Sequence, residues 1–230
     1  MALPKLNDVP KYELKIPSTG KKVKFRPYLV KEEKILLMAA ETKDPSQMID
    51  AIIDTIQACV QSSLDIKALT TFDLEYLFVQ LRAKSVGENA SLKIKCQSCE
   101  HENDYSVNLE DIKCELKTKK KTIELTDTIT VEMKYPSYVD LKENGDEEET
   151  ALNILMNSIA AVYTEDERID IADEPKESVE NFINSMTRDQ FQKVSEFLTE
   201  IPKVEYDIDF NCEKCGEHTH LELRGIQDFF

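Results

Sequence analysis

Alternating apolar and polar positions occur twice along the chain, in the same order each time. A short alternating hairpin comes first, over 12–25 and again over 121–135. Apolar residues at helical spacing follow, and a second pair of alternating runs then appears, over 91–109 and over 204–223. A period of two is typical of strands and a period of 3.6 of helices. The chain therefore predicts a hairpin, helices and a second hairpin, and then the same order again.

The helical segments lie between the hairpins of each half. In the first half they are predicted over 31–40, 44–60 and 70–81. In the second half they are predicted over 146–162, 179–186 and 187–198, with an acidic loop over 164–175. Capping residues such as Asp44 and Thr187 support these starts, because short polar side chains accept the free N–H groups of a first helical turn. We therefore predict an α+β fold of two pseudo-repeated halves, residues 1–113 and 114–230, which form one compact unit.

The second hairpin of each half carries a Cys-x-x-Cys motif between its two strands. The motifs are Cys96-Gln-Ser-Cys99 and Cys212-Glu-Lys-Cys215, offset by 116 positions. Four thiolates in a tetrahedron suit a structural Zn²⁺. A usual zinc ribbon places its second pair roughly 15–20 residues after the first. Here two distant knuckles, within 91–109 and 204–223, would form one split zinc ribbon that joins the halves, and a pseudo-twofold axis would bring them to one ion.

Other interpretations of these cysteines are open at this point. Iron bound as in rubredoxin uses similar ligands, whereas a redox pair would be expected at a helix N-terminus rather than between two strands. The three histidines of the chain, His101, His218 and His220, follow the motifs closely. Because four cysteines already complete a tetrahedron, we expect the histidines beside the site or on the surface. Cys59 lies on an apolar helix stripe and is expected in the core, and Cys114 carries no pairing signal.

The charge of the chain limits the classes of function. The net charge is −16, from 29 basic and 45 acidic residues, which opposes nonspecific binding to nucleic acid. Residues 1–36 carry +5 and residues 143–180 carry −11, so that two oppositely charged segments are candidate contact surfaces or merely solvated faces. No secretory pattern and no apolar run of membrane-spanning length are present, so we expect a cytosolic chain with reduced thiols and no membrane contact.

No catalytic constellation is evident. The sequence has no glycine-rich phosphate loop and no nucleophile elbow, and a zinc site closed by four cysteines leaves no position for a reactive water. We therefore predict a protein that is not an enzyme. Two rivals remain: a zinc-ribbon regulatory protein that binds RNA polymerase or nucleic acid, and a metalloenzyme whose zinc has fewer than four sulfur ligands.

The run from Lys24 to Ala39, KFRPYLVKEEKILLMA, resembles the N-terminal signature of the T4-type bacteriophage baseplate hub protein family. The resemblance implies a hub subunit or a hub assembly factor that works by contact with other hub or tail proteins. It further implies a location in the virion tail baseplate, or in the host cytoplasm during assembly. Four apolar residues of the run have core spacing: Phe25, Leu29, Ile35 and Leu36. Four charged residues are the better candidates for partner contact: Arg26, Lys31, Glu32 and Glu33.

Overall fold

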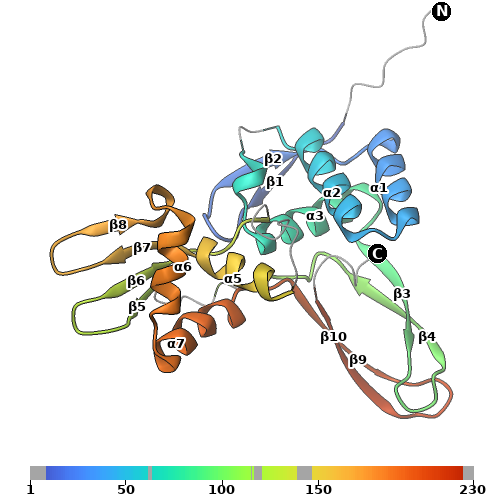
Figure 1. Ribbon diagram of the computed structural model, residues 1–230. Coiled ribbons are helices and arrows are strands. Elements are labelled where there is room, and N and C mark those ends of the chain that lie inside the picture. The colour runs from blue at the N-terminus through green and yellow to red at the C-terminus, as the bar shows by residue number, and fades with distance from the viewer. Residues whose placement is uncertain (1–8, 62–63, 115, 117–120, 139–146, 225–230) are drawn as a thin grey trace, which may run out of the picture. The chain divides into compact units, whose positions relative to one another are not determined.

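The computed structural model describes residues 9–61, 64–114, 116, 121–138 and 147–224, and it divides into two compact units (Figure 1). The first unit gathers Met1–Ile66, Phe72–Leu116 and Lys203–Phe230, and the second gathers Lys67–Thr71 and Lys117–Pro202. Both Cys-x-x-Cys hairpins therefore belong to the first unit. These units do not coincide with the predicted halves, 1–113 and 114–230. The repeat, and the single compact unit that its halves would form, stay predictions.

The first unit begins with a hairpin and two helices. Strands β1 (Tyr12–Lys15) and β2 (Lys22–Phe25) pair antiparallel, with a turn in which Gly20 adopts a φ of 68°. Helices α1 (Val30–Thr42) and α2 (Pro45–Cys59) follow. The Asp44 carboxylate accepts the Ser46 N–H at 2.9 Å, so the predicted cap of α2 is confirmed.

A third helix packs its apolar residues inward beneath the hairpin. The short turn η1 (Ile66–Ala68) leads to α3 (Thr71–Ser85), where Phe72, Leu77 and Phe78 are buried. Asp73 is fully buried and accepts the Ser18 N–H at 2.8 Å, as well as the Ser18 hydroxyl. Because a buried carboxylate needs such donors, this contact ties the β1–β2 turn to the start of α3.

Two long hairpins complete the first unit. Strands β3 (Asn89–Lys95) and β4 (Glu102–Asn108) form one, and β9 (Glu205–Asn211) and β10 (His218–Arg224) form the other. Their inward residues share one core with the end of α3. The buried members are Val79, Ala83, Ala90, Ile94, Val107, Leu109, Ile112, Val204 and Ile208. Apolar and polar residues alternate along all four strands, because this core covers only one face of each hairpin.

The second unit is an antiparallel sheet covered by three helices. The strands run in the order β5-β6-β7-β8: β5 (Thr122–Glu124), β6 (Thr130–Met133), β7 (Ile159–Tyr163) and β8 (Arg168–Asp170). The helices are α5 (Glu147–Asn157), α6 (Lys176–Asn184) and α7 (Arg188–Thr199). Their apolar stripes meet the sheet in one core, which includes Val131, Ile159, Ile183, Val194 and Phe197. The predicted capping box of Thr187 and Gln190 at the start of α7 is confirmed.

Two predictions for the second half are wrong. The helix predicted over 146–162 ends at Asn157, and Ile159 and Val162 lie in β7 instead. Both residues fit helical spacing, but they are β-branched and pair with Met133 and Val131 of β6, so tertiary pairing decides. The predicted loop over 164–175 contains β8 and the short turn η2 (Ile171–Asp173), since β7 supplies a free edge for Arg168–Asp170. Asp146 lies outside the described residues.

Among the described helices, none combines the length and the hydrophobicity that a membrane span requires.

A partly buried carboxylate links α3 to the segment that leads into β9. Glu75 is partly buried on α3, and its side chain accepts the backbone N–H of Val204. Burial raises the pKa of Glu75 to about 7, although the Val204 N–H and Lys203 act in the opposite direction. The carboxyl group is therefore half protonated near neutral pH, and its ionised form is the destabilising one.

Replacing Glu75 with glutamine is expected to remove a pH-dependent loss of stability. Because the folded state holds the Glu75 proton more tightly than the unfolded state, stability falls as the pH rises from the ordinary pKa of 4.5 through about 7. One pKa unit corresponds to about 1.4 kcal/mol, so Glu75→Gln should gain up to about 3 kcal/mol at about pH 8.5 and little at about pH 5. Urea unfolding at both pH values measures this. An equal gain at both values would contradict it.

Candidate metal centre

The four cysteines of the two motifs lie at the adjoining tips of the two long hairpins. Their Sγ atoms all fall within 4.8 Å of one another. Cys96 Sγ lies 3.7 Å from Cys215 Sγ, and Cys99 Sγ lies 3.6 Å from Cys212 Sγ. The first cysteine of each motif thus meets the second cysteine of the other. The structure brings together all four predicted residues from segments more than a hundred positions apart, and their role as metal ligands stays a prediction.

The two knuckles have the same backbone hydrogen bonds. In the first, the Cys96 N–H donates to the His101 carbonyl at 2.9 Å, and the Glu100 N–H returns to the Cys96 carbonyl at 2.9 Å. The second repeats both bonds, from Cys212 to Glu217 at 2.8 Å and from Gly216 to Cys212 at 2.9 Å. Glu100 and Gly216 both have positive φ, of 57° and 74°. This tight turn points both thiols of a motif in the same direction.

Backbone amides of each knuckle also point at its first sulfur. The N–H groups of Cys99 and Ser98 donate to the Cys96 sulfur and lower its pKa. The Cys215 N–H is the main cause that lowers the pKa of Cys212 to about 6. The Glu217 N–H also lowers the pKa of Cys215, but hydrogen bonding with the other three sulfurs and desolvation together raise it to about 12.

The geometry of the four sulfurs fits a tetrahedral metal. With metal–sulfur bonds of about 2.3 Å, the edges of a ZnS₄ tetrahedron are about 3.8 Å long. The two cross-pair separations, 3.6 and 3.7 Å, are close to that value and far above the roughly 2.05 Å of a disulfide. Cys96 and Cys212 are buried, whereas Cys215 is exposed. A metal here would be enclosed by four sulfurs at the hairpin tips.

One residue of the site was not predicted from the sequence. Asn103 is buried on β4, and its side-chain amide spans the two knuckles. Its Oδ1 accepts the Glu213 N–H at 2.9 Å, while its Nδ2 donates to the His101 carbonyl at 3.0 Å. The signal was a polar residue at an inward position of an alternating strand, in register with Tyr105 and Val107.

The histidines and the remaining cysteines lie outside the four-sulfur cluster. His218 and His220 are exposed, and His220 Nδ1 lies 3.0 Å from the Asp209 carboxylate. Cys59 is completely buried, which confirms its predicted place in the core, and burial raises its pKa to about 11. Burial likewise raises the pKa of Cys114 to about 12. Both of these thiols are therefore protonated at neutral pH, and neither belongs to the four-sulfur cluster.

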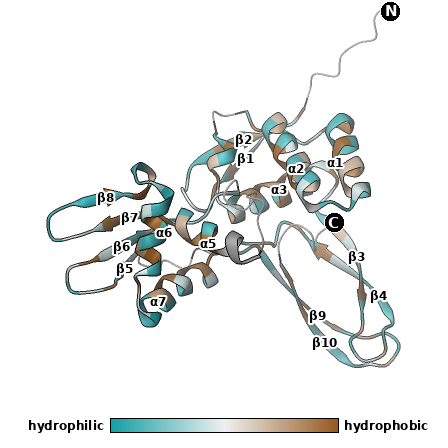
Figure 2. Ribbon diagram, viewed as in Figure 1, coloured by the Kyte–Doolittle hydropathy of each residue, from teal (hydrophilic) through white to brown (hydrophobic). Residues whose placement is uncertain are grey.

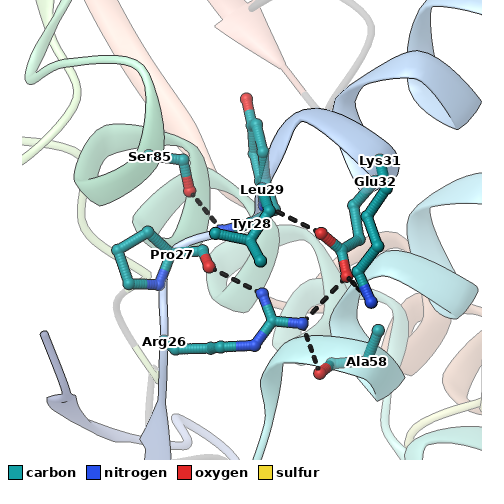
Figure 3. A network of polar contacts seen from close by, with 8 residues as sticks. All are labelled: Arg26, Pro27, Tyr28, Leu29, Lys31, Glu32, Ala58 and Ser85. Atoms are coloured by element: carbon teal, nitrogen blue, oxygen red, sulfur yellow. Dashed lines mark hydrogen bonds and ion pairs between the residues drawn. The ribbon is translucent and has the colours of Figure 1, made fainter. Parts of the chain in front are cut away.

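The signature segment Lys24–Ala39 forms a second polar site, in which one ion pair organises the start of α1 (Figure 3). Arg26 Nη2 lies 2.8 Å from Glu32 Oε1, with the two side chains only 15% and 4% exposed. Arg26 also donates to the carbonyls of Pro27 at 2.9 Å and Ala58 at 3.1 Å. Glu32 Oε2 accepts the Leu29 N–H at 2.8 Å, so the same carboxylate caps the helix.

This network corrects the predictions for the segment. Arg26 and Glu32 were candidates for partner contact, but both are engaged inside the first unit, because the guanidinium reaches the last turn of α2. Burial raises the pKa of Glu32, but the bonds from Arg26 and Leu29 outweigh it and hold the pKa below its usual range. Leu29 and Ile35 were expected in the core and are instead 41% and 48% exposed.

Comparison with known families agrees with the resemblance of the signature segment. The family model described as T4 bacteriophage base plate protein matches residues 9–230, which is nearly the whole chain. No curated protein and no solved structure matches the chain. Because the match extends from the first hairpin through α1 and both cysteine motifs, it rests on far more than one short run of residues. The chain therefore belongs to the T4-type baseplate protein family.

Proposed function

We propose that this protein is a structural or assembly component of the baseplate hub, acting by contact with other hub or tail proteins. Its family places it among components of the virion tail and suggests a protein without enzymatic activity. The observation that carries the proposal is the family match over residues 9–230. A regulatory zinc-ribbon protein, the rival function, finds no support in the family match.

We further propose that Cys96, Cys99, Cys212 and Cys215 hold one structural Zn²⁺. The metal would close the two hairpin tips on each other, and a closed tetrathiolate site leaves no position for catalysis. Iron would fit the same four sulfurs. We favour zinc because nothing among the described residues around the cluster suggests electron transfer.

The proposed duplication of halves 1–113 and 114–230 has two kinds of support. The first is the reciprocal pairing of the cysteines, which a twofold relation between the knuckles would produce. The second lies in the two units taken separately. The residue after β2, Arg26, donates its N–H to the carbonyl of Cys59 at 3.1 Å, where α2 ends. The residue after β6, Lys134, donates in the same way to Ser158 at 2.7 Å, where α5 ends.

An affinity-tagged copy of the chain in infected cells tests the proposed function. A hub subunit is expected in purified tails at constant stoichiometry, whereas an assembly factor is expected only in hub intermediates that lack the finished tail. Mass spectrometry of both fractions distinguishes the two roles, with an equally tagged head protein as the control for carry-over. Absence from both fractions would overturn the hub proposal.

A further inference from the structure

Helix α1 has an apolar outer face that the described residues of the first unit leave uncovered. Val30, Leu37 and Met38 are 65%, 60% and 68% exposed, and Ile35 is 48% exposed. The spacing of 30, 37 and 38 places these three on one side of the helix. The opposite side, with Glu32, Leu36 and Ala39, is the one that is buried. Brown segments on α1 in Figure 2 mark the apolar stretches of its ribbon.

Exposed apolar residues are concentrated on and just before helix α1. Among the large hydrophobic residues that are exposed in the described part of the chain, five of eight belong to residues 29–38. Single exposed apolar residues are ordinary on a protein surface, but a cluster of them marks a contact site. The face is also held rigidly, because the Arg26–Glu32 pair and the Leu29 cap fix the start of the helix. A partner would therefore bind a preformed surface.

Two charged residues indicate what covers this face. Lys34 and Glu41 are both exposed and lie on the same side of α1 as Val30 and Leu37. Take the midpoint of the face to lie between Leu37 and Met38. Lys34 lies about one turn before this midpoint, and Glu41 lies about one turn after it. When two copies of such a helix cross antiparallel at that midpoint, Lys34 of each copy lies opposite Glu41 of the other. The face is thus complementary to itself, because its charges pair with opposite charges and its apolar residues meet apolar residues of the second copy.

We propose that a second copy of this chain docks on α1, in an antiparallel helix pair with its twofold axis between Leu37 and Met38. In an isologous interface of this kind every contact is made twice. Leu37 and Met38 form its centre, two Lys34–Glu41 pairs flank them and set the orientation, and Val30 lies one turn further out. The proposal goes beyond the hub function and depends on neither that function nor the metal, since α1 is distant in sequence from all four cysteines.

The charge pair permits a test in which two defects repair each other. In Lys34→Glu every Glu41 faces a glutamate, and in Glu41→Lys every Lys34 faces a lysine, so each variant is expected to be monomeric. In an equimolar mixture, one copy of each variant forms two opposite-charge pairs again, and a one-to-one heterodimer is expected. Lys11→Glu changes an exposed lysine outside α1 and serves as the control, with wild-type behaviour expected. Exposed substitutions usually cost within about 0.5 kcal/mol, so all variants should fold.

Sedimentation velocity of the metal-loaded full-length chain measures the outcome, over roughly two orders of magnitude of concentration around the micromolar range. A mass tag on one variant identifies the heterodimer, and circular dichroism checks that each variant is folded. Dimers of wild type, monomers of each single variant and heterodimers of the mixture are expected. The proposal is overturned if the wild type stays monomeric over the whole concentration range. This holds even if another baseplate protein is found to bind α1. Folded single variants that still dimerise would overturn it as well.

Discussion

Replacing Cys212 with serine is expected to release the proposed zinc and unfold the paired hairpins β3–β4 and β9–β10. The two hairpins come from distant segments and are held together by their shared core and by Asn103, and the four sulfurs of the proposed site lie at their tips. In zinc-finger peptides a structural zinc contributes roughly 10–16 kcal/mol of apparent binding energy, which is also folding energy. That range is comparable to the whole stability of a typical domain, about 5–15 kcal/mol. Loss of one ligand should therefore exceed the effect of any ordinary surface substitution.

Hydrogen exchange followed by mass spectrometry locates this effect. In Cys212→Ser, and in wild type treated with a strong zinc chelator, exchange should accelerate over 89–108 and 205–224. It should remain slow in α6 and α7, which belong to the second unit. Cys114→Ser is the matched control, because Cys114 is a partly buried thiol outside the cluster. Equal behaviour of the two serine variants would contradict a metal-dependent pairing of the hairpins.

Replacing Glu32 with alanine is expected to cost about 3–5 kcal/mol of stability, the usual effect of removing one partner from a buried ion pair. The substitution leaves Arg26 with only the carbonyls of Pro27 and Ala58, and it also removes the acceptor for the Leu29 N–H. Glu32→Gln should cost less, because its side-chain oxygen can still accept that N–H. Because the pKa of Glu32 is lowered, its contribution is present above the ordinary pKa of 4.5 and is lost as the pH falls through the folded-state value.

Urea unfolding of Glu32→Ala beside Glu33→Ala measures this cost. Glu33 lies in the same first turn of α1 but is only half-buried, so its removal should cost well under 1 kcal/mol. Similar losses in the two variants would show that the Arg26–Glu32 pair contributes no more than an ordinary acid at a helix start.

The four hairpin runs could be predicted from the sequence because each of them covers only one face. Ala90 and Ile94 are buried, with exposed residues between them along β3, and such alternation is visible in any single strand. The cysteine cluster was predictable for a similar reason, since two equal motifs with equal flanking strands suggest one site.

The remaining features depend on contacts that no local pattern encodes. Ile159 and Val162 fit a helix as well as a strand, and only the edge offered by β6 decides between them. In the sequence, Arg26 and Glu32 resemble surface charges. Only the fold brings the Ala58 carbonyl, at the end of α2, to the Arg26 guanidinium, which donates a hydrogen bond to it. Ile35 of α1 was misjudged for the same reason, because it has the spacing of a core residue but is 48% exposed.

Metal quantitation combined with X-ray absorption on the purified chain tests whether one zinc is held jointly by Cys96, Cys99, Cys212 and Cys215. We expect one zinc per chain with four sulfur neighbours at about 2.3 Å. Two zinc ions per chain, no metal, or nitrogen and oxygen ligands in place of sulfur would contradict it.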